Sequence, residues 1–195
     1  MSAPDFKGRR GYAELLADRR GQLEAPRYAD QVAAIVTAMV GAFRAGHKVL
    51  WFGNGGSAAD AQHLAAEFSG RFLRERPGLP SEALTVNSSA VTAIANDFGY
   101  ENLFSRMVEA LAGPGDVVVG ITTSGTSKNV VRGLEAAKAR GATAVAFTGN
   151  GGGTVAEVAD LALVGPDGYS AIVQEVHIVM GHIICDLVEQ ELLFA

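Results

Sequence analysis

The residues best suited to binding an anion lie in one short segment, Gly53-Asn54-Gly55-Gly56-Ser57, which follows an apolar run. An alanine-rich stretch, residues 58–67, comes directly after it. This order predicts a buried strand, a tight glycine turn and a helix that begins at the end of the strand. Because the first backbone N–H groups of a helix have no partner within the helix, such a segment favours an anion.

The same predicted helix carries an expected cap and a candidate acid–base pair. Ser57 suits the N-cap, and Asp60 stands three residues on, at the position of a capping-box partner. His63 and Glu67 are four residues apart, so their side chains point from one face of the helix. An anion site followed by such a pair indicates an active site, although a capped core helix with an incidental surface pair has the same spacing.

A second loop with hydroxyl donors follows the β-branched run of residues 116–122. Its sequence is Thr122-Thr123-Ser124-Gly125-Thr126-Ser127, and a predicted helix begins after it. Hydroxyl groups and backbone N–H groups at a helix start can bind phosphate without a lysine or arginine. Neither loop matches a nucleotide-binding pattern, because the Gly-Lys-Ser/Thr ending and the acidic ribose partner are missing.

The rest of the chain alternates between apolar runs and amphipathic stretches. The predicted strands are residues 48–52, 82–86, 116–122, 142–148 and 161–164. The predicted helices are residues 11–23, 28–45, 58–68, 89–96, 101–112, 128–140, 154–159 and 171–193. This alternation predicts an α/β domain whose parallel sheet is covered by helices on both faces, with ligands beyond the carboxyl ends of the strands.

Two further segments are interpreted separately from this pattern. The helix at residues 28–45 is apolar over more than half its turn, which fits either contact with another subunit or burial within the chain. The glycine-rich segment 149–153 is expected to be a flexible turn without chemistry.

Composition restricts the class of protein. Of the 195 residues, 48% are hydrophobic and 19% are charged, which is typical of one globular domain. The formal net charge of −5 argues against nucleic acid as a partner. The single cysteine, Cys185, excludes an internal disulfide, and its apolar helical surroundings predict a buried thiol. We expect no signal peptide and no run of about 20 apolar residues, hence a cytoplasmic protein with no membrane partner.

Taken together, the motifs resemble the sugar isomerase (SIS) family and, within it, the phosphoheptose isomerases. The resemblance covers the chain from about residue 32 to the end, and it is carried by residues 53–67, 84–97, 114–116, 123–125 and 172–182. It implies a single SIS domain over residues 1–195, with a five-stranded, flavodoxin-like parallel sheet flanked by helices and an N-terminal helical extension at residues 1–45. The implied activity is ketose–aldose isomerisation of sedoheptulose 7-phosphate to D-glycero-D-manno-heptose 7-phosphate through an enediol.

The resemblance also implies site residues. The substrate-binding set is Asn54, Gly55, Gly56, Ser57, Glu67, Asn96, Asp97, Thr122, Thr123, Ser124, Ser127 and Gln174. The metal-ligand set, for one Zn²⁺ per subunit, is His63, Glu67, Gln174 and His182. Glu67 and His182 are also implied as the catalytic acid–base pair, with either as the initial base. Periodicity alone does not separate His182 from His177, since both lie on faces adjacent to Gln174.

The chain departs from the family pattern at two places. Thr122 and Thr126 stand where relatives more often have serine and asparagine, and Thr122 keeps the hydroxyl. Ala171-Ile172 stands where relatives often have an acidic or hydroxyl residue followed by arginine, which weakens what is implied about the sugar end and subunit contacts.

The resemblance further implies a homotetramer whose sites are completed by neighbouring subunits, with a sugar phosphate as the small-molecule partner. The alternative function is that of a non-catalytic SIS protein, which binds a replication-initiator partner or senses a sugar phosphate. Relatives of that kind tend to lose the acid–base pair, whereas this chain retains Glu67 and His182.

Overall fold

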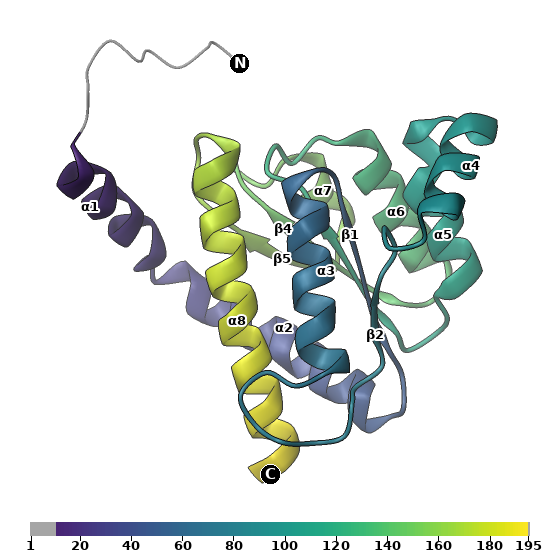
Figure 1. The fold of residues 1–195 in the computed structure, drawn as a ribbon, viewed down its shortest axis with the longest axis horizontal. Coiled ribbons are helices and arrows are strands. Elements are labelled where there is room, and N and C mark those ends of the chain that lie inside the picture. The colour runs from purple at the N-terminus through teal and green to yellow at the C-terminus, as the bar shows by residue number, and fades with distance from the viewer. Residues whose placement is uncertain (1–10, 195) are drawn as a thin grey trace.

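The computed structural model describes residues 11–194, which form a parallel sheet between two layers of helices (Figure 1). The five strands, β1 Val49–Gly53, β2 Ser81–Ala83, β3 Val117–Ile121, β4 Thr143–Thr148 and β5 Leu161–Val164, are arranged in the order β2-β1-β3-β4-β5. Every neighbouring pair is parallel. The flavodoxin-like α/β fold is therefore confirmed. The part of the expected N-terminal extension at residues 1–10 lies outside the described residues.

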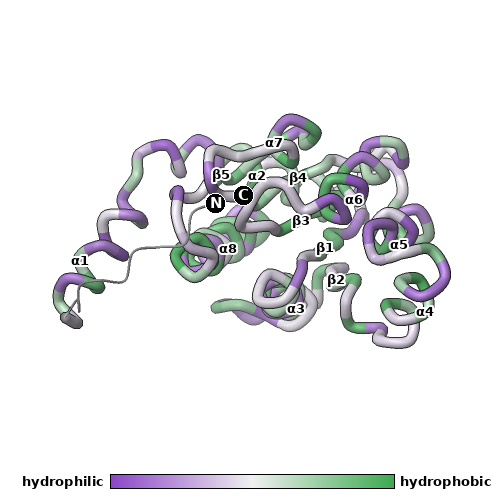
Figure 2. The backbone as a smooth tube through the Cα atoms, turned by 90° about the horizontal axis from the view of Figure 1, so that it is seen from above, coloured by the Kyte–Doolittle hydropathy of each residue, from purple (hydrophilic) through white to green (hydrophobic). Residues whose placement is uncertain are grey.

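The helices divide between the two faces of the sheet, as the view from above shows (Figure 2). α2 Arg27–Arg44, α3 Gly56–Ser69 and α8 Ser170–Phe194 cover one face. α5 Leu103–Leu111, α6 Lys128–Ala139 and α7 Gly153–Val158 cover the other, with α4 Ser88–Phe98 and the 3₁₀ turn η1 Tyr100–Asn102 beside α5. The predicted limits agree within two residues except at β2, where a turn replaces the end of the predicted strand 82–86.

The first strand, β1, contributes large side chains to the cores on both faces of the sheet. Successive side chains of a strand point to opposite faces, so Trp51 and Phe52 enter different cores. Trp51 packs against Phe68 and Phe147, with ring centroids 6.1 and 6.0 Å away. Phe52 stacks on Phe104 at 4.7 Å. These buried rings fix the strand from which the loop at residues 54–57 starts.

The broad apolar face of α2 is buried within the chain. Val32, Ile35, Met39 and Phe43 belong to the core that α2 shares with the sheet and α8. Burial within the chain is therefore enough to explain this apolar face, without contact with another subunit. The preceding helix, α1 Tyr12–Leu23, has no buried residue and extends away from the rest of the molecule (Figure 1).

The last helix, α8, spans 25 residues and is long and apolar enough, by length and composition alone, to cross a membrane. The expectation that no stretch reaches this limit is therefore wrong. Packing explains the composition, because Val176, Met180 and Ile184 are buried in the core shared with α2 and α3. Cys185 is buried on the same helix, as expected, and burial raises the pKa of its thiol.

The start of α3 differs from the expected cap. The helix begins at Gly56, and its N-cap is Gly55, with φ +55° and no side-chain cap. The cap expected from Ser57 and Asp60 is therefore wrong. Ser57 is 2% exposed and packs against Gly53, where an added Cβ would lie 2.8 Å from the Ser57 Cβ. One carboxylate oxygen of Asp60 is buried without a hydrogen-bond partner among the described residues, and burial raises the pKa of this group.

Candidate active site

The loops after β1 and β3 lie side by side, because Gly53 and Ile121 at the strand ends are paired in register. Asn54 joins the first of these loops to the start of α6, the helix that follows the second. Its Nδ2 donates to Asn129 Oδ1 at 2.9 Å, and Asn129 Nδ2 donates back to Asn54 Oδ1 at 2.8 Å. The Tyr100 hydroxyl also donates to Asn54 Oδ1 at 2.8 Å. Asn129 is buried in the first turn of α6 and is absent from the predicted site, because its only sequence signal is its place just after the second loop.

Gly56 allows α8 to approach the start of α3 closely. A Cβ added to Gly56 would lie 2.5 Å from Gln174 Nε2, so the amide of Gln174 lies beside the first loop. His182 lies about 12 Å further along the axis of α8. This position fits Gln174 as a substrate-binding residue, and its role as the fourth metal ligand stays a prediction.

Hydroxyl groups of the loop after β3 converge, as a phosphate site requires. Thr122 Oγ1 lies 3.3 Å from Ser124 Oγ and 2.9 Å from Ser127 Oγ. Ser127 is the N-cap of α6 and makes no side-chain cap hydrogen bond, so the N–H groups of the first turn remain directed at this loop. Thr123 points elsewhere, since its Oγ1 lies 2.9 Å from Ser170 Oγ at the start of α8.

The turn after β4 packs directly against this loop at residues 122–127. Gly125 has φ +72°, and an added Cβ would lie 2.5 Å from the carbonyl oxygen of Gly152. Asn150 Nδ2 donates to the Thr123 carbonyl at 2.9 Å, and the Gly168 N–H donates to Asn150 Oδ1 at 3.0 Å. The turn at residues 149–153, for which no chemistry was expected, thus makes specific contacts with the loop at residues 122–127. Gly152 and Gly153 allow the backbone of this turn to touch that of Gly125, which shapes the loop at residues 122–127.

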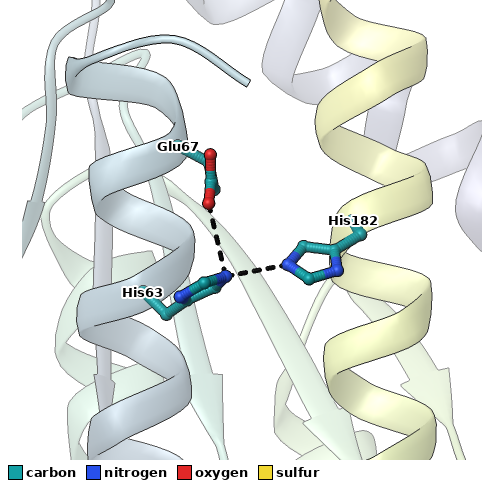
Figure 3. Close-up of side chains that lie close together, drawn as sticks. All are labelled: His63, Glu67 and His182. Atoms are coloured by element: carbon teal, nitrogen blue, oxygen red, sulfur yellow. Dashed lines mark hydrogen bonds and ion pairs between the residues drawn. The ribbon is translucent and has the colours of Figure 1, made fainter. Parts of the chain in front are cut away.

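His63, Glu67 and His182 come together between α3 and α8 (Figure 3). His63 Nε2 lies 2.8 Å from His182 Nε2 and 3.3 Å from Glu67 Oε1. The three ligand atoms all lie within 4.8 Å of one another. The side chains of His63 and Glu67 are 50% and 22% exposed, so the cluster is open to a ligand.

The donor set fits a divalent metal ion. Two donors bound to a tetrahedral Zn²⁺ at 2.0–2.1 Å lie roughly 3.3 Å apart. The distance between His63 Nε2 and Glu67 Oε1 has this value, and that between the two imidazoles is shorter by about half an ångström. Two imidazoles and a carboxylate are ordinary zinc ligands, and three protein ligands leave a position for substrate or water, as in catalytic sites.

The structure separates the two histidines of α8. His182 belongs to the cluster, whereas His177 is fully buried and its Nε2 lies 2.9 Å from the Thr148 carbonyl oxygen. Since a carbonyl only accepts, His177 Nε2 carries the proton of the neutral ring, and its Nδ1 is buried without a partner among the described residues. Burial lowers the pKa of His177 to about 4.

His177 is therefore expected to make the free energy of unfolding fall as the pH drops from about 6.5 to about 4. Over this range the unfolded chain binds a proton that the folded chain does not, so acid favours unfolding. The free energy of unfolding is measured in urea at pH 7.5 and at pH 4.5. Between these two pH values it should fall by up to about 3 kcal/mol less in H177Q than in the wild type. The glutamine amide can still donate to Thr148. Equal losses in both proteins would contradict this assignment.

Asn96 and Asp97 lie apart from these groups. Both are exposed on α4, and Asn96 Nδ2 donates to Asp97 Oδ1 at 2.8 Å. α4 packs on η1 and α5. Within residues 11–194, neither side chain bonds to the two loops or to the cluster, so their contact with a sugar stays a prediction.

Comparison with known proteins identifies close relatives. The family described as "SIS domain" matches residues 12–149. A phosphoheptose isomerase of Aquifex aeolicus (strain VF5) is 53% identical over 163 residues, which cover 84% of this chain and 85% of the relative. A phosphoheptose isomerase of Burkholderia pseudomallei (strain 1710b) is 48% identical over 186 residues, 95% of this chain and 91% of the relative.

Comparison with solved structures gives relatives of the same kind as the sequence comparison. The solved structure of a phosphoheptose isomerase from Neisseria gonorrhoeae matches with a TM-score of 0.85 at 39% sequence identity, over 91% of this chain and 96% of that one. The similarity thus extends over nearly the full length of both chains, far beyond the segments that carry the motifs.

Proposed function

The chain belongs to the phosphoheptose isomerase family of SIS-domain proteins, and we propose that it converts sedoheptulose 7-phosphate to D-glycero-D-manno-heptose 7-phosphate for heptose biosynthesis. The observation that carries the proposal is the convergence of His63, Glu67 and His182 from two helices. A relative that only binds a partner or senses a sugar has no need of such a cluster. The alternative function is therefore less well supported.

Glu67 and His182 offer the groups that this reaction requires. Interconversion of a ketose and an aldose moves a proton between C1 and C2 through an enediol, which needs a base at carbon and an acid at oxygen. We assign Glu67 as the base and His182 as the acid, and the reverse assignment would use the same two side chains. A metal ion, when bound, supplies positive charge that stabilises the developing enediolate.

Zinc is the metal ion that we propose for this cluster, one per chain. Its support is the donor set of His63, Glu67 and His182 and the distances between the donor atoms. Gln174 is proposed to contact the substrate from beside Gly56, and to complete the ligand set if its side chain turns toward His182.

The loop at residues 122–127 is proposed to hold the phosphate. Its support is the convergence of three hydroxyls at the N-terminus of α6, beside the loop of residues 54–57. Binding energy from a phosphate remote from C1 and C2 helps to position the reacting carbons. Asn96 and Asp97 are proposed to contact the sugar.

We also propose a homotetramer in the cytoplasm. On α8, Ile183 is 41% exposed and lines, with Met180 and Leu187, an apolar groove of about 440 Å³ against α2. A second copy packed there would cover these apolar side chains. The single buried thiol fits a reducing compartment.

The experiment that tests the function is conversion of sedoheptulose 7-phosphate by the purified protein in D₂O, followed by NMR. We expect an aldoheptose 7-phosphate with deuterium at C2, because the base that carries the proton is open to solvent. A folded protein that binds the ketose phosphate without converting it would contradict the isomerase and favour the sensing or partner-binding alternative.

A further inference from the structure

The loop that follows α3, residues 70–77, contacts three residues of α8, and one of them is His182. Phe72 stacks on the His182 ring, with centroids 5.4 Å apart and an interplanar angle of 29°. Arg74 pairs with Asp186, and three backbone N–H groups of the loop donate to Glu189. Positions 182, 186 and 189 lie on one face of α8, so the loop follows the face that carries the proposed metal ligand.

Glu189 is the point at which the loop is fixed. The residue is fully buried, yet each of its carboxylate oxygens accepts two hydrogen bonds. Oε1 accepts from Phe72 N at 2.9 Å and from Arg76 Nε at 3.0 Å. Oε2 accepts from Leu73 N and Arg74 N, both at 3.0 Å. A buried carboxylate is tolerated only when it is paired and hydrogen-bonded in this way, so the loop has one well-defined position.

Arg76 connects the same carboxylate to the end of α3. Its side chain is 2% exposed. Nη2 donates to the carbonyl oxygen of Glu67 at 2.8 Å, and Nη1 donates to that of Phe68 at 2.8 Å. One guanidinium thus holds the last turn of α3, which carries Glu67, against Glu189 of α8. The pair fixes the spacing across which Glu67 and His182 face each other.

We propose that Glu189, Arg76 and Phe72 are positioning residues for the metal-binding cluster. Glu189 and Arg76 hold the loop and the end of α3 in place, and the Phe72 ring sets the orientation of the His182 imidazole. This inference rests on the proposed metal site. Residues that orient metal ligands commonly change metal affinity by 10–100-fold when they are replaced.

The test measures binding of Co²⁺, a spectroscopic substitute for Zn²⁺, to the metal-free full-length chain. E189Q should weaken Co²⁺ binding by about 10–100-fold, because an amide nitrogen cannot accept the hydrogen bonds of the loop. F72L should weaken it by about 3–10-fold through loss of the ring contact, and F72Y, which keeps the ring, should restore it. E75Q makes the same chemical change at an exposed position of the loop and should bind Co²⁺ like the wild type.

Two further measurements separate positioning from general stability. Thermal unfolding of the metal-free variants identifies any that fail to fold; if E189Q is among them, F72L and F72Y decide the question. In the double variant, F72L should add little to E189Q, because Phe72 acts through the loop that Glu189 holds. If folded F72L and E189Q bind Co²⁺ with wild-type affinity, the positioning role is wrong but the proposed metal site still stands. Absence of Co²⁺ binding by the wild type would overturn the proposed metal site and this inference with it.

Discussion

Replacement of Glu67 by glutamine is expected to lower kcat for sedoheptulose 7-phosphate by about 10²–10⁴-fold, the usual contribution of a positioned general base. Glutamine keeps the size and the carbonyl oxygen of the side chain but cannot take a proton. The side chain is partly exposed and the backbone carbonyl is held by Arg76, so the fold should persist. Steady-state kinetics, with thermal unfolding as the check on folding, make the measurement.

The matched control is E109Q, which makes the same change at an exposed position of α5, on the opposite face of the sheet. It should retain wild-type kcat and KM. Folded E67Q with wild-type turnover would contradict the assignment of Glu67 as a catalytic residue, whichever of the two roles it has.

Substitution of Gly125 by alanine is expected to lower kcat/KM by about 10²-fold, because a Cβ there collides with the Gly152 carbonyl and displaces the phosphate loop. The positive φ of +72° adds conformational strain. The effect should fall mainly on KM, and inorganic phosphate should compete less well with the substrate. Kinetics and phosphate inhibition, measured on the same preparation, test this expectation.

Gly151 provides the control that separates strain from collision. It has φ +74°, close to that of Gly125, but an added Cβ would meet nothing within 4 Å. G151A should therefore lose about 1–2 kcal/mol of stability and keep its kcat/KM. If the two variants lose kcat/KM equally, the contact between the two loops does not shape the phosphate site.

The central strands β1, β3 and β4 could be predicted from the sequence because they are short, mostly apolar runs buried on both faces of the sheet. Residues 116–122 and 142–148 show this pattern, and the strands found there differ by one residue at most from each predicted limit. The start of α3 could not be predicted in the same way. A serine and an aspartate three residues apart match a capping box, but in the structure Gly55 takes the cap and Ser57 packs inward.

The positions of the loops at residues 54–57 and 122–127 were also predictable, since each depends on a local run of glycines or hydroxyls at the start of a helix. The choice of His182 for the cluster with His63 and Glu67 depended on family resemblance, because His177 and His182 are equivalent by helical period, and only burial against Thr148 separates them. The contacts that support the site join residues far apart in the chain. Asn54 and Asn129 are 75 positions apart, and Arg76 and Glu189 are 113 positions apart. Asn54 lies in a predicted loop, and the only sequence signal of Asn129 is its place just after the second loop. Arg76 and Glu189 are ordinary charged residues with no local signal.

The central claim is that metal bound by His63, Glu67 and His182 supports isomerisation of a seven-carbon ketose phosphate. Its most direct test is turnover of sedoheptulose 7-phosphate by protein stripped of metal and then titrated with Zn²⁺. We predict that the stripped protein is inactive and that activity rises with added Zn²⁺, levels off at one ion per chain and stays absent in E67Q. Full turnover by the folded, metal-free chain would contradict the claim.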